Sequence, residues 1–301
     1  MLKLFAVLWP LFALILGGYA CRRLKFPNEQ FWPGAERFNY FVLFPALLFR
    51  SLATAPLNIP ALPRIALCVG LVMGLGGLAL LLLRRVFHWR ANRFGVFVQG
   101  TLRFNTYIGL ATIGGLYGAE GLTLMALLLA ITVPIVNVLS VYAFTSEQSV
   151  HPGTIALNVL KNPLIVACLL GLGANFLGLR LIGGLDNFLS LLATTSLPLG
   201  LLCVGAALQP QELVKERTAL VSNSLSRLLV VPALAYALVV LWGVPTMEKV
   251  ILVVFFALPT APTGYVLARQ LGGDAHLMAG VITLQTLVAA ISLPFLIWLL
   301  M

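Results

Sequence analysis

The strongest constraint in this sequence is a series of long stretches that contain no charged side chain. Such stretches cover residues 65–83, 121–146, 228–247 and 277–301. Each is close to the ~20 mostly apolar residues that an α-helix needs to cross the hydrocarbon core of a bilayer. The stretches lack the alternation of apolar and polar residues typical of strands, and a helix satisfies its own backbone hydrogen bonds in lipid. The chain is therefore predicted to be an all-α integral membrane protein.

The composition supports a bilayer as the solvent. Charged residues make up 9% of the chain, against about 25% in soluble domains, so too few polar side chains are available to cover a water-exposed surface. The net charge is +10, but the basic residues lie in short segments between apolar stretches. We therefore expect the lipid bilayer, and no nucleic acid, as a partner. The cysteine spacing matches no metal site, and we expect no metal and no cofactor.

The pattern predicts ten membrane spans and no soluble domain. The predicted spans are 4–21, 36–53, 63–84, 94–117 and 121–144, followed by 157–178, 186–208, 217–241, 248–269 and 275–300. Lysine and arginine are more frequent in the odd-numbered connections, which the positive-inside rule places in the cytoplasm. We therefore expect a multi-pass inner-membrane protein with both termini on the extracytoplasmic side. The oligomeric state is left open, with a homodimer as one alternative.

The two halves of the sequence resemble each other at a shift of about 154 residues. At this shift the matching positions include Pro10 and Pro163, Pro45 and Pro198, and Gly118 and Gly272. Because five spans are an odd number, the two halves must be inserted in opposite orientations. The chain is thus predicted to be a 5+5 inverted repeat, with residues 1–150 as the first repeat and 151–301 as the second. Many secondary transporters have this architecture.

The fourth and ninth predicted spans have the features of interrupted helices. In the ninth span, Pro259 and Pro262 each remove a backbone donor and clash with the preceding turn, and Gly264 permits unusual dihedral angles. The fourth span contains a polar stretch that ends at Gly109. We predict helix breaks at Gly109, Pro259, Pro262 and Gly264, with a simple proline kink in the ninth span as the alternative. In inverted-repeat transporters, substrate binds where such paired helices are interrupted.

Arg103 is the most informative residue of the fourth span. It lies about ten residues into the span, roughly 15 Å deep at ~1.5 Å per residue, and no acidic residue lies at a similar depth. A charge at this depth needs a partner, which a bound anion would supply. The alternatives are that Arg103 holds carbonyl groups of the broken helices or extends to the cytoplasm. The predicted substrate-binding residues are Arg103, Asn105, Thr106, Tyr107, Pro259, Thr260, Pro262 and Thr263.

Several of these segments resemble the auxin efflux carrier family, which includes plant PIN carriers and bacterial malonate and malate permeases. The similar segments are 105–110, 118–121, 162–165, 197–208, 258–261 and 265–269. The resemblance implies ten spans and a fold similar to sodium/proton antiporters and bile-acid symporters. It also implies that broken fourth and ninth spans cross and bind a carboxylate, which moves by an elevator-like mechanism. Ala111 and Thr112 stand where the family often has a proline, so the sharpness of the fourth-span break is left open.

From these features we expect a secondary transporter for a small organic anion, a mono- or dicarboxylate. A membrane enzyme would need paired carboxylates or a histidine acid–base site, but the histidines His88, His151 and His276 are far apart in the sequence. We therefore expect no enzyme and no catalytic residue. A channel-like permease and a sodium- or proton-coupled symporter of another substrate class are the alternatives. The absence of a carboxylate deep in a span argues against coupling through such a group.

Overall fold

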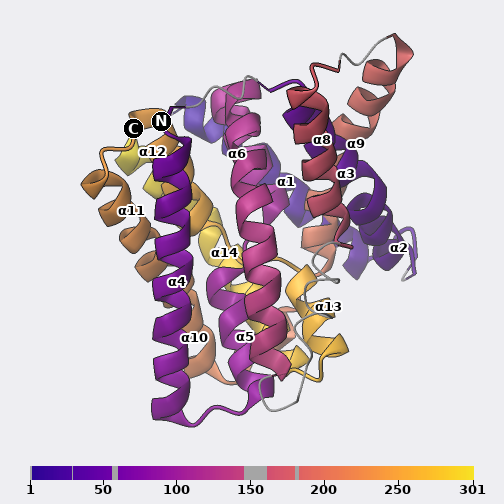
Figure 1. The fold of residues 1–301 in the computed structure, drawn as a ribbon. Coiled ribbons are helices and arrows are strands. Elements are labelled where there is room, and N and C mark those ends of the chain that lie inside the picture. Colours follow the sequence, from indigo (N-terminus) through magenta and orange to yellow (C-terminus); the bar gives the residue numbers. More distant parts are fainter. Residues whose placement is uncertain (1, 29, 56–59, 146–160, 180–182) are drawn as a thin grey trace. The chain divides into compact units, whose positions relative to one another are not determined.

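The computed structural model describes residues 2–28, 30–55, 60–145, 161–179 and 183–301. Throughout these ranges the regular elements are helices, and no strand occurs (Figure 1). Five helical stretches of the described chain are long and apolar enough to cross a membrane: 62–87, 91–145, 184–206, 217–241 and 275–300. The prediction of an all-helical membrane protein is confirmed, whereas the ten-span 5+5 arrangement stays a prediction.

The described residues form two compact units, and each unit draws on both halves of the sequence. Unit 1 takes its residues from Met1–Ile59, Tyr107–Val133 and Asn158–Ala207, and unit 2 from Pro60–Thr106, Pro134–Leu157 and Leu208–Met301. The predicted repeat boundary at residues 150 and 151 lies outside the described residues, as does His151. The division into two repeats therefore stays a prediction, and it differs from the division into compact units.

Unit 1 is built around close packing of α1 against α9. Its helices are α1 (Leu2–Arg23), α2 (Phe31–Phe38), the π-helical turn η1 (Asn39–Leu43), α3 (Phe44–Ala53), α8 (Pro163–Phe176), α9 (Gly184–Ala206) and part of α6 (Thr106–Thr145). A Cβ atom added to Gly18 would lie 1.9 Å from the carbonyl oxygen of Leu202, and one added to Gly205 would lie 1.7 Å from that of Ile15. Only glycine allows the two backbones to approach so closely, which is how helices often pack in membranes.

Unit 2 contains the helices that form the candidate site. They are α4 (Leu62–Phe87), α5 (Ala91–Leu102), the end of α6, the 3-10 turn η2 (Pro210–Val214), α10 (Arg217–Leu225), the π-helical turn η3 (Ser226–Val230), α11 (Val231–Leu241), α12 (Thr246–Ala257), α13 (Thr263–Gln270) and α14 (Ala275–Leu300). Figure 1 shows α5, α13 and α14 close together within this unit.

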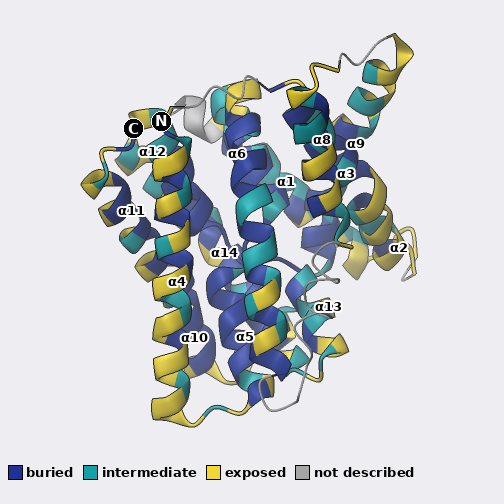
Figure 2. Cartoon of the chain, in the orientation of Figure 1, coloured by how far each residue is buried: buried dark blue, intermediate teal, exposed yellow. Residues whose placement is uncertain are grey.

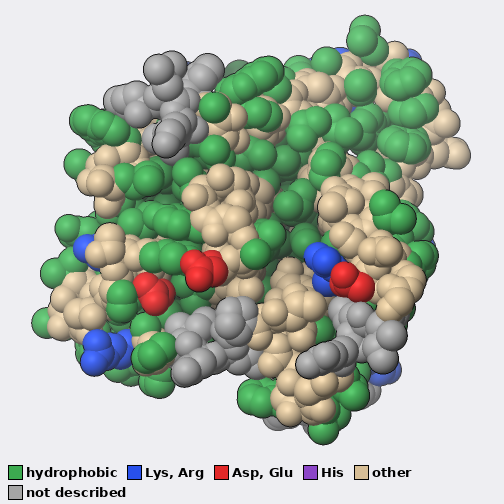
Figure 3. Space-filling model, turned by 90° about the horizontal axis from the view of Figure 1, so that it is seen from above, with side chains coloured by type: hydrophobic (Ala, Val, Ile, Leu, Met, Phe, Trp, Pro, Cys, Tyr) green, Lys and Arg blue, Asp and Glu red, His purple; other side chains and the backbone are tan. Residues whose placement is uncertain are grey.

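Burial separates the central helices of unit 2 from those on its outside. Residues 250–257 of α12 and 94–102 of α5 are all buried, so neighbouring helices surround both (Figure 2). A helix that is apolar on every side belongs in such a position. In contrast, α4 exposes large apolar side chains such as Leu78 and Val86. Seen from above, the molecule also has hydrophobic side chains over much of its visible face (Figure 3).

The fourth and ninth predicted spans are both interrupted. Helix α5 ends at Leu102 and α6 begins at Thr106, and α12 ends at Ala257 and α13 begins at Thr263. The helices before the two breaks, α5 and α12, are both 12 residues long. After each break comes a glycine with positive φ, at 59° for Gly118 and 71° for Gly272. These two glycines match in the sequence at the same shift of 154 residues.

Candidate functional site

The two helix breaks of unit 2 are joined directly by their backbones. The N–H of Asn105 donates a hydrogen bond to the carbonyl of Pro259, with 2.7 Å between nitrogen and oxygen. A broken helix leaves backbone groups without their partners one turn away, and in an apolar interior each such group must be satisfied elsewhere. Here one break supplies a donor and the other an acceptor. We call residues 103–105 and 258–262 together the break junction.

Arg227, in the π-helical turn η3, binds the carbonyl ends of both helices that stop at the break junction. Its Nε donates to the carbonyl of Leu258 at 2.6 Å, and its Nη2 donates to that of Phe255 at 3.3 Å, both at the end of α12. Its Nη1 donates to the carbonyl of Thr101 at 3.1 Å, at the end of α5. Each helix C-terminus carries roughly half a negative charge, so a single buried guanidinium faces two such ends.

Side-chain amides and one hydroxyl bind further backbone groups around the break junction. Gln285 of α14 accepts a hydrogen bond from the N–H of Thr260 at 2.9 Å and donates to the carbonyl of Gly100 at 3.0 Å. The Thr260 hydroxyl donates to the carbonyl of Gln99 at 2.9 Å. Gln285 also donates to the side chain of Asn223 at 3.0 Å. Buried hydrogen bonds of this kind hold a region in one arrangement.

Arg103 lies at the break junction and is held by two neutral amides. Its Nε donates to Gln99 Oε1, and its Nη2 donates to Asn137 Oδ1 at 2.9 Å. These two contacts orient the guanidinium through uncharged acceptors. The Gln99 side chain is fully buried, and its Nε2 has no hydrogen-bond partner among the described residues. A buried donor of this kind is costly unless a ligand or water accepts from it.

The start of α13 lies next to the same two side chains. A Cβ atom added to Gly264, the second residue of α13, would lie 3.6 Å from Gln99 Oε1 and 3.7 Å from Arg103 Cδ. The positive end of a helix dipole is at its N-terminus. The guanidinium of Arg103 and the positive end of α13 therefore form one electropositive region, and the Gln99 amide lies beside it.

A comparison with protein families shows which kind of protein has these joined helix breaks. A family model described as "Membrane transport protein" matches residues 4–297, nearly the whole chain. The chain belongs to the membrane transport protein family. This family is auxin efflux carrier-like, as the resemblance of the sequence segments suggested. No curated protein matches the chain.

Seven of the eight predicted binding residues of this membrane transport protein fall in or next to the break junction. Arg103, Asn105, Pro259 and Thr260 lie inside it, Pro262 ends it, and Thr106 and Thr263 are the residues with which α6 and α13 begin. Tyr107 instead belongs to unit 1. Its ring packs against Phe44, with 5.1 Å between ring centroids, and against the backbone of Gly200.

Two of the predicted helix breaks need correction. Gly109 lies within α6, after the break has ended at Asn105, and has helical dihedral angles. Gly264 also lies within a helix, so its role is not an unusual backbone conformation. The glycine there allows close approach, because Met278 Cε would be only 2.7 Å from an added Cβ atom. The prolines Pro259 and Pro262 do lie in the interrupted segment that the sequence predicted.

Sequence reasoning missed Arg227, although a signal for it was present. Arg227 is ten residues from the start of the predicted span 217–241, so it is as deep in its span as Arg103 is in the fourth. It stands directly before the charge-free stretch 228–247. Binding the carbonyls of the broken helices was one alternative for Arg103. In the structure, Arg227 has this role.

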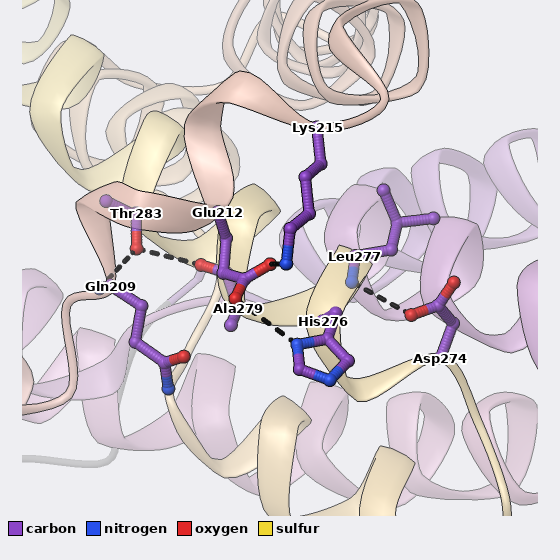
Figure 4. Close-up of polar contacts among 8 residues, drawn as sticks. All are labelled: Gln209, Glu212, Lys215, Asp274, His276, Leu277, Ala279 and Thr283. Carbon is purple, nitrogen blue, oxygen red and sulfur yellow. Dashed lines mark hydrogen bonds and ion pairs between the residues drawn. The ribbon is translucent and has the colours of Figure 1, made fainter.

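A second polar cluster of this membrane transport protein fixes η2 to the start of α14 (Figure 4). Glu212 Oε1 lies 3.2 Å from Nδ1 of His276, and Glu212 Oε2 lies 3.1 Å from Nζ of Lys215. The N–H of Gln209 donates to the Thr283 hydroxyl at 2.9 Å. Desolvation by burial raises the pKa of the Glu212 carboxyl, but hydrogen bonds from Lys215 and His276 outweigh it, so the net pKa is lowered. Glu212 is therefore ionised at neutral pH.

Proposed function

We propose that this membrane transport protein is a secondary carrier for small organic anions, with a mono- or dicarboxylate as the substrate. The observation that carries the proposal is the electropositive region at the break junction. There the Arg103 guanidinium, held by neutral amides, lies beside the buried Gln99 amide and the first turn of α13. A carboxylate offers acceptor oxygens to the guanidinium and the amide, and its negative charge is favoured at the positive end of α13.

The position of this region on broken helices favours a carrier. In secondary transporters with inverted repeats, half-helix N-termini bind the anionic group of the substrate, and the site alternates between the two sides of the membrane. We propose an elevator-like form of alternating access in the inner membrane, with both chain termini outside the cytoplasm. Transport would follow the substrate gradient or the membrane potential, because the sequence has no acidic residue deep in a predicted span.

Uptake into proteoliposomes tests the proposal. Purified protein would be reconstituted and supplied with radiolabelled malonate, malate and other mono- and dicarboxylates. We expect saturable uptake of at least one anion, accelerated when the same anion is preloaded inside the vesicles. Flux that rises linearly with concentration and shows no such counterflow would instead support a channel. Absence of protein-dependent flux across the whole panel would refute an anion carrier.

A further inference from the structure

We propose that Arg227 is a built-in cation that holds the break junction together in the place where a bound metal cation would otherwise be needed. It is a positioning residue for the site and is distinct in role from Arg103. The proposal rests on the three carbonyl contacts of Arg227, on its complete burial and on the helix ends that it joins. It concerns the stability of the junction and does not depend on which substrate the protein carries.

The carbonyl groups around Arg227 form a cluster that requires a positive partner. Leu258 and Phe255 contribute carbonyls from the end of α12, and Thr101 contributes one from the end of α5. Carbonyl oxygens that converge in this way repel one another and are typical ligands of metal cations. Two helix C-termini together carry roughly one negative charge. The single positive charge of a guanidinium is therefore the amount that the cluster needs.

The shape of the side chain also matches the cluster. A guanidinium is planar and presents its donors in a fixed fork, and here Nε, Nη1 and Nη2 each donate to a different carbonyl. Arg227 lies in the π-helical turn between α10 and α11, and such turns are frequent at functional sites. Because all three acceptors belong to the backbone, changing any single neighbouring side chain would leave them in place.

Arg227 and Arg103 therefore have different roles in unit 2. Arg227 is fully buried and its acceptors are backbone carbonyls, so its charge is used within the protein. Arg103 is partly exposed and is oriented by the side chains of Gln99 and Asn137. We infer that the junction of the two broken helices keeps its geometry without a sodium ion.

Thermal unfolding of the purified protein tests this role. Arg227→Ala should lower Tm by about 10 °C, because it leaves buried carbonyls without their charged partner. Millimolar guanidinium should fit the space that the variant opens and raise its Tm by several degrees. Urea at the same concentration should not, since it has a similar shape but no charge. Arg217→Ala, which removes an exposed arginine of the same helical segment, is the matched control and should respond to neither compound.

A pair of further variants covers the case in which Arg227→Ala cannot be purified. Arg227→Lys keeps the charge, and Arg227→Met keeps the length of the side chain without it. We expect a folded fraction, measured by size-exclusion chromatography, that is several-fold larger for Arg227→Lys than for Arg227→Met. Equal fractions would overturn the proposal.

Three other results would also overturn it. They are an Arg227→Ala variant as stable as the wild type, a variant that urea rescues as well as guanidinium does, and a wild-type Tm that is higher in sodium chloride than in choline chloride. None of these measurements involves transport. Their outcome is therefore separate from that of the uptake experiment.

Discussion

The backbone nitrogen of Asn105 and the carbonyl oxygen of Pro259 are 2.7 Å apart, although 154 residues separate them in the chain (259 − 105). This bond joins two helix breaks that the sequence places at matching positions of its two halves. It also explains why the breaks are tolerated in an apolar environment, because one break supplies a backbone N–H donor and the other a carbonyl acceptor.

Replacing Arg103 by glutamine should weaken anion transport. A hydrogen bond to a charged group contributes about 1.5–3 kcal/mol, so the KM for uptake should rise by about 10- to 100-fold. Tm should change by only a few degrees, because Gln99 and Asn137, which bind Arg103, are neutral side chains that can rearrange. Arg217→Gln serves as the control and should transport normally. An unchanged KM for Arg103→Gln would remove this residue from the site.

Gln99→Glu separates a binding role of Gln99 from a structural one. The carboxylate has nearly the same shape as the amide, but it pairs with Arg103 and removes the Nε2 donor. We expect anion uptake to fall by at least about 10-fold while Tm stays equal or rises. The experiment compares uptake and thermal unfolding on the same preparation. Loss of Tm together with unchanged KM would show that Gln99 is only structural.

A methyl group at Gly264 should disturb the site more than it disturbs the fold. In Gly264→Ala, the new Cβ atom would meet Met278 Cε at 2.7 Å and approach Gln99 and Arg103. The end of a methionine side chain can move, so we expect a small fall in Tm and a several-fold fall in uptake. Gly173→Ala in α8 is the control, since nothing lies within 4 Å of an added Cβ atom there. Its intrinsic helix propensity should make it neutral or stabilising by up to ~1 kcal/mol.

The polar cluster around Glu212 should stabilise the folded protein at neutral pH, and this stabilisation should disappear in acid. The pKa of Glu212 is lowered in the folded state, whereas an unfolded glutamate titrates near about 4.3. The stabilisation is therefore fully present above about pH 4.3 and is lost as the pH falls through the lower, folded value. Glu212→Gln should lower Tm at pH 7, and the difference from wild type should shrink below about pH 4.

The exposed Glu120 provides a control for this pH series. Glu120→Gln should follow the wild-type Tm at every pH. A Glu212→Gln difference that is constant from pH 7 to the acid limit would contradict the assignment of the stabilisation to the ionised carboxylate.

The sequence was informative where local chemistry decides the outcome. Pro259 and Pro262 lack backbone donors, so an interruption at this place could be predicted whatever the tertiary structure. Charge-free stretches longer than a helical span likewise required an apolar solvent. The break after Leu102 was harder to place, because no proline marks it. Its position depends on Arg227 and Thr260, whose hydrogen bonds come from distant parts of the chain.

The surroundings of Tyr107 and Gln285 depend on long-range contacts. Tyr107 follows Thr106 directly, yet it belongs to unit 1 because its ring packs against α3 and α9. Gln285 is one polar residue in an apolar stretch, and nothing in the sequence marks it as important. Its side chain binds backbone groups of both breaks because α14 lies beside them. Estimating how deep each arginine lies in its predicted span would have identified Arg227 from the sequence.

The central claim is that a carboxylate binds where the two breaks meet, and labelling of a single cysteine tests it most directly. Thr263, the partly exposed first residue of α13, would be replaced by cysteine in a protein whose four native cysteines are changed to alanine. The rate of reaction with a sulfonate-bearing methanethiosulfonate would then be measured in proteoliposomes with and without the transported anion. The account predicts that the anion slows labelling, with a half-maximal concentration equal to its KM. A labelling rate that is unchanged at saturating anion, in protein that still transports it, would contradict the account.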